Sequence, residues 1–246
     1  MDEIIQYELI RSKCKTVSLC VKEDGTVEVR APKWVTKAEI QRFVDEKANW
    51  IIKKRQEAAK RNCVSKKHYT EDAVFACLSK EYRLHIAESG RNAVGVEDNP
   101  QNASDESPDT LLIKTIRTDE DYVKELLMKW CSRQLKEYVR KKAAEYLPML
   151  SELAAREGKP EPEIWKITIR NVKSRWGSCS AKGALNFNVK LVMAPVFAVD
   201  YVIAHELCHL LYMNHQAEFW EAVQALVPDC RERRRYLKEN GWQYEF

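Results

Sequence analysis

The sequence lacks any run of about eighteen uninterrupted apolar residues, the length that a membrane-spanning helix needs, so we expect no membrane partner. It has little excess charge: 41 Lys and Arg against 37 Asp and Glu leave +4, which predicts no nucleic-acid partner. Its acidic start lacks the basic and apolar stretches of a secretory signal. None of its eight cysteines forms a CxxC pair. Such scattered thiols are expected to be reduced, which predicts a cytoplasmic protein.

What is present suits a globular α+β protein. With 246 residues and 45% hydrophobic content, the chain can bury a sizeable core. Segments 4–10, 16–21 and 27–30 are β-rich, and a turn signal precedes the last, so we predict an N-terminal β-meander. Thr36 and Glu39 form a capping box that predicts a helix after the sheet.

Strands and helices also alternate in the remainder, around a polar insertion. We expect a strand at 82–86, a flexible loop at 88–110 and a strand at 111–116. Thr118 with Asp121 is predicted to cap a long helix, bent or broken at Pro148. The later elements are strands at 165–172 and 184–189, and helices at about 199–212, 217–226 and 230–238.

This pattern predicts three segments. They are a β-rich segment with a helix at 1–87, the flexible loop at 88–110, and a domain at 111–246. One continuous domain that includes the N-terminal part is the alternative. No oligomeric state is predicted.

The apolar helix near 199–212 contains the motif His205-Glu206-Leu207-Cys208-His209. Residues four apart lie above one another on a helix, so both imidazoles can bind the same metal ion. Glu206 lies about 100° further round, where it can reach a water bound to that ion. Burying these polar groups costs several kcal/mol unless something binds them. The pattern predicts a metal site, with a histidine cluster of purely structural role as the alternative.

His215, six residues after His209, is the third predicted ligand. At about 100° per residue a continuing helix would turn it away, so we expect the helix to end near 212–214 and the chain to reverse. Asn214 tolerates the left-handed conformation that ends many helices. Three imidazoles leave an open fourth position on Zn²⁺, as catalytic zinc sites do. We therefore predict His205, His209 and His215 as zinc ligands and Glu206 as the catalytic residue.

Segment 170–180, with the sequence RNVKSRWGSCS, joins two predicted strands just before this helix. Arg175 or the loop amides could bind a substrate carboxylate, phosphate or oxyanion. The structural alternative is that Trp176 and Gly177 only shape a tight turn. The basic run 53–67 is interpreted as a weak candidate for polyanion contact, and the run 231–235 as a solvated helix face.

Four motifs together resemble the YgjP-like zinc metallopeptidases, relatives of the SprT-like and minimal zincin proteins. They are SRWGSCS at 174–180, LNFN at 185–188, YVIAHELCH at 201–209 and NHQAEFW at 214–220. The resemblance implies a zincin-like metallopeptidase core with the same three zinc ligands and Glu206 as general base. Some members carry a nucleoside triphosphate pyrophosphatase label, so it does not imply the substrate. Tyr212 stands where metzincins have glycine, and segment 74–80 lacks the glycines expected there.

The predicted reaction is hydrolysis of a peptide bond in a peptide or protein substrate. Glu206 would take the proton from a zinc-bound water and pass it to the leaving amine. Arg175, Asn214 and Tyr212 are candidates for stabilising the oxyanion, and 185–189 is the candidate edge strand for an extended peptide. The alternatives are a metal-dependent nucleoside triphosphate pyrophosphatase, with Lys173 and Arg175 on the phosphates, and a non-catalytic zinc-stabilised interaction module.

Overall fold

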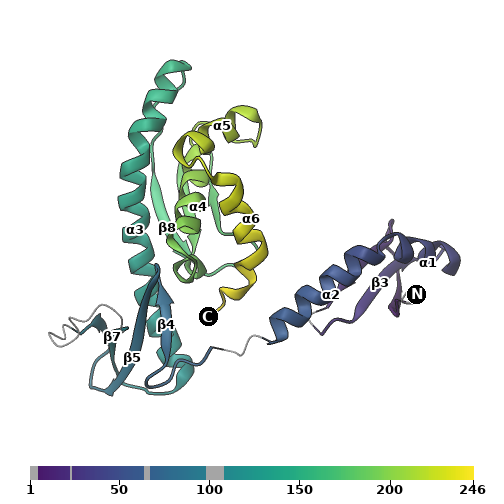
Figure 1. Cartoon of the computed structure of the whole chain (residues 1–246), viewed down its shortest axis with the longest axis horizontal. Coiled ribbons are helices and arrows are strands. Elements are labelled where there is room, and N and C mark those ends of the chain that lie inside the picture. The colour runs from purple at the N-terminus through teal and green to yellow at the C-terminus, as the bar shows by residue number, and fades with distance from the viewer. Residues whose placement is uncertain (1–4, 23, 64–66, 98–107) are drawn as a thin grey trace. The chain divides into compact units, whose positions relative to one another are not determined.

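The structure, a computed structural model, describes residues 5–22, 24–63, 67–97 and 108–246. The chain divides into two compact units, residues 1–66 and 67–246. Both units mix helices with small β-sheets, so the protein is α+β, as predicted (Figure 1). None of the described helices combines the length and the apolar character needed to cross a membrane.

The first unit contains a three-stranded sheet in the order β1-β3-β2, and the predicted β-meander is wrong. β1 (Glu8–Ser12) pairs with β3 (Val27–Pro32) in parallel, and β2 (Ser18–Val21) pairs with β3 antiparallel. β3 has buried residues on both faces, whereas β1 and β2 have none. The central strand of the sheet is thus the one that is covered on both faces.

Two helices, α1 (Lys37–Glu46) and α2 (Ala48–Cys63), complete this unit. The predicted capping box is confirmed: the Glu39 amide donates to Thr36 Oγ1 at 3.2 Å, and the Thr36 amide donates to Glu39 Oε2 at 2.8 Å. These bonds satisfy two amides that the helix itself leaves free. The helices and the sheet share a core of Val27, Val29, Ala31, Ile40, Val44 and Ile51.

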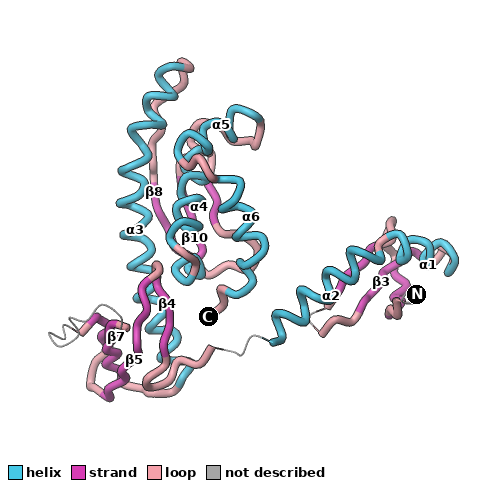
Figure 2. Tube along the Cα trace, viewed as in Figure 1, coloured by secondary structure: helices cyan, strands magenta, loops and turns pink. Residues whose placement is uncertain are grey.

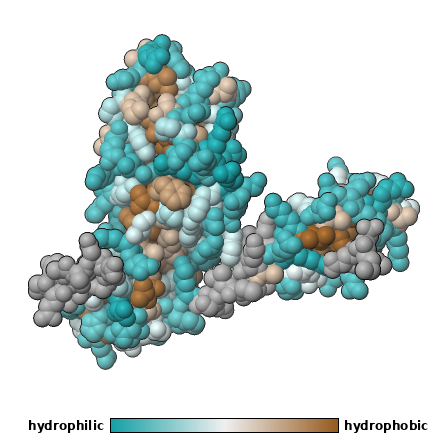
Figure 3. All heavy atoms as spheres, viewed as in Figure 1, coloured by the Kyte–Doolittle hydropathy of each residue, from teal (hydrophilic) through white to brown (hydrophobic). Residues whose placement is uncertain are grey.

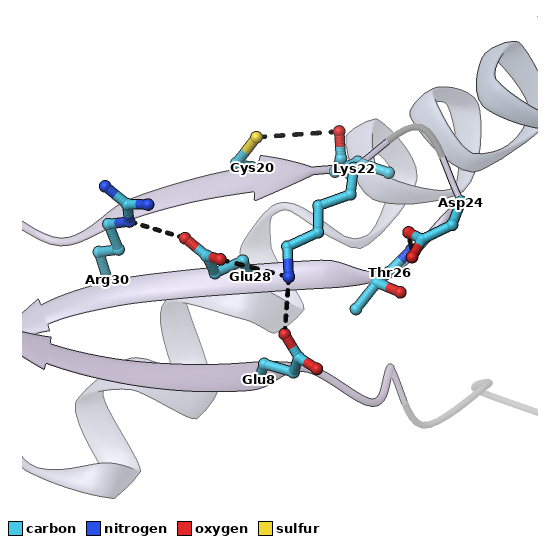
Figure 4. Close-up of polar contacts among 8 residues, drawn as sticks. Glu8, Cys20, Lys22, Asp24, Thr26, Glu28 and Arg30 are labelled. Carbon is cyan, nitrogen blue, oxygen red and sulfur yellow. Dashed lines mark hydrogen bonds and ion pairs between the residues drawn. The ribbon is translucent and has the colours of Figure 1, made fainter.

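One exposed lysine neutralises like charges on adjacent strands of this sheet (Figure 4). Glu8 and Glu28 are register partners on β1 and β3, where two carboxylates repel. The Lys22 ammonium lies 2.8 Å from Glu8 and 3.4 Å from Glu28, and Arg30 Nε donates to Glu28 at 2.7 Å. The hydrogen bond from Arg30 lowers the pKa of Glu28. These cations relieve the repulsion between the strands.

The second unit begins with a four-stranded sheet in the order β4-β5-β7-β6. Its strands are β4 (Val74–Cys77), β5 (Lys80–Glu88), β6 (Ala93–Val96) and β7 (Asp109–Thr115). The predicted loop 88–110 therefore contains a strand, β6, which pairs antiparallel with β7; its remaining part at 98–107 lies outside the described residues. The expected boundary at residue 87 falls inside β5, because β5 pairs with β7 across the insertion.

The long helix α3 (Glu120–Arg156) runs beside both sheets of this unit (Figure 1). Its N-cap is Asp119, whose side chain accepts from the Tyr122 amide, so the predicted cap at Thr118 is wrong by one residue. The helix continues through Pro148, so no break occurs there. Apolar residues along α3 keep it packed, which offsets the cost of the proline ring and the lost hydrogen bond.

The remaining elements form a second layer along α3. β8 (Lys166–Arg170), β10 (Ala184–Asn188) and β9 (Gly177–Cys179) form a sheet in that order, with β8 and β10 side by side (Figure 2). A 3-10 turn, η1 (Val189–Met193), leads into α4 (Val196–Cys208). Then follow α5 (Ala217–Leu226), at its predicted bounds, and α6 (Cys230–Asn240), two residues longer than predicted; η2 (Gly241–Gln243) follows it.

A strained hairpin turn holds the beginning of α4. Leu78 and Ser79 join β4 to β5, and both have positive φ, 52° and 63°, in the segment that lacks the expected glycines. The Leu78 amide donates to the Val192 carbonyl, and the Ser79 hydroxyl accepts from the Val196 amide at 3.0 Å. The sheet thereby caps the N-terminus of the helix that carries the candidate site.

On the face visible in Figure 3, hydrophilic residues cover most of the described surface of each unit, with hydrophobic residues showing between them. Beneath the surface, one core joins the sheets, α3 and the C-terminal helices of the second unit. Trp130 of α3 packs edge-on against Phe75 and Tyr82, at centroid distances of 6.3 and 5.3 Å. This continuous packing fixes α4 against α3.

Candidate metal centre

Helix α4 carries His205 and Glu206 in its last turn, and most of its residues are buried. It ends at Cys208, earlier than the expected 212–214, and His209 is its C-cap. The Leu210 amide donates to the Leu207 carbonyl, three residues earlier, so a turn of the 3-10 type follows the helix. The two imidazoles nevertheless keep their expected one-turn spacing, with ring centroids 4.9 Å apart.

The chain reverses after this turn and brings His215 back to the other histidines. The reversal does not use a left-handed residue at Asn214, because Asn214 is not among the positive-φ residues. Instead, Tyr212 provides its carbonyl as a partner of His209 Nδ1 at 2.8 Å. That bond orients the His209 ring and leaves its Nε2 free.

The three imidazoles offer nitrogen atoms that all lie within 4.8 Å of one another. His205 Nε2 and His215 Nε2 are 3.1 Å apart. Two nitrogens bound to one tetrahedral zinc, each at about 2.0–2.1 Å, would be separated by about 3.3 Å. Phe219 packs against all three rings from beneath, at 4.5 to 4.9 Å. The donor set and its spacing fit a zinc ion.

The surroundings keep two of these imidazoles neutral, which is the form that binds a metal. Burial lowers the pKa of His205 to about 3, with smaller contributions from His209, His215 and Arg234. Burial, His209 and Arg234 also lower the pKa of His215. His205 Nδ1 is buried and has no hydrogen-bond partner among the described residues, which a charged imidazole would not tolerate.

Glu206 is 5% exposed and lies against β9. A β-carbon on Gly177 would lie 2.6 Å from both Glu206 Cγ and Oε1, so the glutamate occupies the space that a side chain at 177 would need. Burial raises the pKa of Glu206 to about 8, and the positive charge of Arg175 opposes that shift. A divalent cation beside it would further favour the carboxylate. Glu206 is thus a buried carboxyl group, packed on Gly177, on the residue next to His205.

The strand beside Glu206 is an edge strand, but it is β9 rather than the expected 185–189. Leu185 and its neighbours in β10 are central, between β8 and β9. On either side of β9, the Trp176 carbonyl accepts from the Asn188 amide at 2.8 Å, and the Ser180 amide donates to the Ala184 carbonyl at 3.0 Å. By the antiparallel alternation, the main-chain groups of Gly177 and Cys179 face away from β10. No described strand pairs with that side of β9.

The three candidates for oxyanion stabilisation lie in different surroundings. The Tyr212 hydroxyl donates to Glu157 at 2.7 Å, and Lys159 Nζ lies 3.4 Å from the centroid of the Tyr212 ring. The Tyr212 side chain therefore contacts residues at the C-terminal end of α3. Asn214 and Arg175 are exposed. Arg175 also accepts, through its carbonyl, a hydrogen bond from the Asn188 side chain, which fixes its main chain. Of the three, only the charge of Arg175 acts on Glu206.

Sequence reasoning missed three residues near the histidines. Phe219 and Trp220 follow His215 by four and five residues, in the first turn of α5, and the Trp220 ring lies 5.8 Å from both His205 and His215. Arg234 of α6 belongs to the run interpreted as a solvated face, yet its guanidinium lies 4.8 Å above the Trp220 ring. The spacing from His215 could have indicated the aromatics, whereas nothing in the sequence relates Arg234 to them.

No curated protein and no solved structure matches the chain. One family model, described as "YgjP-like, metallopeptidase domain", matches residues 15–240. The match includes parts of both units and all three histidines. A metallopeptidase family implies a divalent metal, typically zinc, and the histidine cluster is where this chain can hold one. The resemblance seen in the four sequence motifs is confirmed, and the chain belongs to the YgjP-like metallopeptidase-domain family.

Proposed function

We propose that the protein is a zinc-dependent peptidase in which His205, His209 and His215 hold the metal and Glu206 is the general base. The observation that carries the proposal is the convergence of three imidazoles within 4.8 Å, with a buried carboxyl on the residue next to one of them. Zinc in such a site makes water a nucleophile near neutral pH and polarises a carbonyl.

The chain's own residues would move the proton. Glu206 takes it from the attacking water and delivers it to the leaving amine, so that one group serves as base and then as acid. A raised pKa suits both steps, because the carboxylate must accept the proton and the acid must release it near neutral pH. Arg175 and Asn214 are the candidates for the developing oxyanion, since the Tyr212 hydroxyl is already bonded to Glu157.

The open side of β9 supports a peptide as the substrate. An extended peptide can add to an exposed strand edge through main-chain hydrogen bonds, without a required sequence. Gly177 and Cys179 offer such groups there, and Gly177 is also the residue against which Glu206 packs. A peptide paired with β9 would therefore pass beside the base.

Metal analysis of the purified protein tests the site. We expect about one zinc per chain in the wild type and its loss in His205→Ala. His68→Ala is the matched control, because His68 is exposed, pairs with Glu120 and lies outside the cluster, so it should keep the zinc. Equal metal contents in all three proteins would refute the site.

Activity of the zinc-loaded protein separates the candidate functions. We expect cleavage of an unfolded protein such as casein by the wild type, and its loss in Glu206→Gln with zinc retained. Turnover of UTP without proteolysis, lost in both Glu206→Gln and Arg175→Ala, would instead establish the nucleotide pyrophosphatase. Unfolding on zinc removal, with no activity on either substrate, would establish the interaction module.

A further inference from the structure

Arg234 is a cation held close to the candidate metal centre by an aromatic ring. Its guanidinium lies 4.8 Å above Trp220, within the range of a cation–π contact. The same ring lies 5.8 Å from His205 and from His215. The neighbouring Arg233 anchors this part of α6, because it pairs with Asp229 at 2.7 Å and donates to the Phe197 carbonyl at 3.0 Å.

The position of this charge is unfavourable unless an anion joins it. The Trp220 ring contacts Arg234 on one hand and lies 5.8 Å from His205 and His215 on the other, so the positive charge of Arg234 would repel a divalent cation bound by the histidines. Among the described residues it has no ion-pair partner, and its side chain is exposed. Asp229, the N-cap of α6, forms its ion pair with Arg233 instead. An unpaired arginine stacked beside a cation site is suited to bind an anionic group of a ligand.

We propose that Arg234 binds a carboxylate of the peptide substrate, within one or two residues of the scissile bond, and so selects acidic or carboxyl-terminal sequences. The inference rests on the proposed peptidase function. The two centroid distances place the guanidinium at most about 11 Å from the histidine rings, and one or two residues of an extended peptide, at about 3.3–3.6 Å each, span that distance together with an acidic side chain. The guanidinium that contacts the ring carries a planar set of N–H donors, which suits a two-point contact with a carboxylate.

The test measures binding rather than turnover. The protein is loaded with Co²⁺, whose visible absorption reports ligands that enter the metal site, and it is titrated with two hydroxamates. One carries a carboxylate two carbons from the hydroxamate, and the other carries the corresponding amide. We expect the wild type to bind the carboxylate probe about tenfold more tightly, as a charge-assisted hydrogen bond provides. The preference should disappear in Arg234→Ala and persist in part in Arg234→Lys.

Arg235→Ala is the matched control, because Arg235 is an exposed arginine on the same helix and should leave the preference intact. Equal affinities for both probes in the wild type, with normal cobalt absorption, would overturn the role of Arg234 and leave the metal site standing. A protein that binds no cobalt would overturn the proposed function itself.

The source of the carboxylate is distinguished with peptide substrates. Cleavage of a peptide with a free C-terminus is compared with that of its C-terminal amide, and cleavage of an Asp-containing peptide with that of its Asn counterpart. The Arg234-dependent preference should reside in one of these pairs. Tighter binding of a phosphate-monoester probe than of the carboxylate probe, by tenfold or more, would overturn the carboxylate assignment.

Discussion

A methyl group at Gly177 should displace Glu206 and so test how the base is held. Gly177 does not have positive φ, so alanine would cause no backbone strain there. The added β-carbon would lie 2.6 Å from Glu206 Cγ and Oε1 and 2.8 Å from Cδ. Carbon atoms prefer about 3.5–4.0 Å, so the carboxyl group must shift by about 1 Å or the strand must move. Gly177→Ala therefore perturbs one buried side chain through steric contact alone.

The expected magnitudes follow from that overlap. Overpacking a buried site by one methyl group costs about 1–3 kcal/mol of unfolding free energy. In the second unit, which comprises residues 67–246, this corresponds to a Tm lower by about 2–12 °C. A catalytic group misplaced by about 1 Å can lose on the order of 10²-fold in rate. We expect kcat to fall accordingly while the zinc content stays unchanged, because the three atoms nearest to the added β-carbon all belong to Glu206 and none to a histidine.

A double-mutant cycle on thermal stability separates this explanation from general damage. In a Glu206→Ala background the space beside Gly177 is empty, so adding Gly177→Ala should cost little, which gives a coupling of about 1–3 kcal/mol. Gly90→Ala is the control, because a β-carbon there would meet no atom within 4 Å. The reasoning is refuted if Gly177→Ala lowers the Tm equally in both backgrounds, or leaves Tm and activity at the wild-type level.

Three further outcomes are expected. Asp119→Ala should lower the unfolding free energy by about 1 kcal/mol in denaturant titrations, because it removes the N-cap of α3, whereas Thr118→Ala should change it by less than about 0.5 kcal/mol. Pro148→Ala should raise the Tm, since an exposed proline inside a helix costs up to about 3 kcal/mol; an unchanged Tm would show that packing has absorbed the cost. A hydrogen bond to Glu71 raises the pKa of His85, so, while Glu71 is ionised, this pair stabilises the fold fully below about pH 6.5, and its contribution is lost as pH rises through the folded pKa. An NMR titration should therefore show a higher pKa for His85 in the wild type than in Glu71→Gln, and equal values would contradict the pairing.

Local patterns predicted the features that depend on neighbours in the sequence. The Thr36–Glu39 capping box is a contact between residues three apart, and the stacking of His205 over His209 follows from one turn of helix. The bounds of α5 follow from its apolar spacing in the same way. Where two side chains compete for one local role, the pattern fails by a residue, as at Asp119.

Pairings between distant segments could not be predicted. The parallel pairing of β1 with β3, and that of β5 with β7 across the 88–110 insertion, join strands that other elements separate in the sequence, so no local pattern specifies them. The proximity of Arg234 to Trp220 depends on the packing of α5 and α6 around α4, so the sequence of neither helix indicates it. Strand order also decided the identity of the edge strand: LNFN at 185–188 has the alternation of a half-exposed strand, yet β10 lies between two others.

The edge position of β9 explains the glycine in the SRWGSCS motif, which the composition of the motif alone did not explain. Gly177 needs no side chain because Glu206 fills that space, and its main-chain groups face the open side because Trp176 and Ser180 provide the bonds to β10. A larger residue would exclude the base, and a partner strand on the open side would exclude a peptide. Both conditions hold at the same residue, as the proposed action of Glu206 on a strand-paired peptide would require. The glycine is therefore better explained by the glutamate on α4 than by a tight turn or an anion-binding loop.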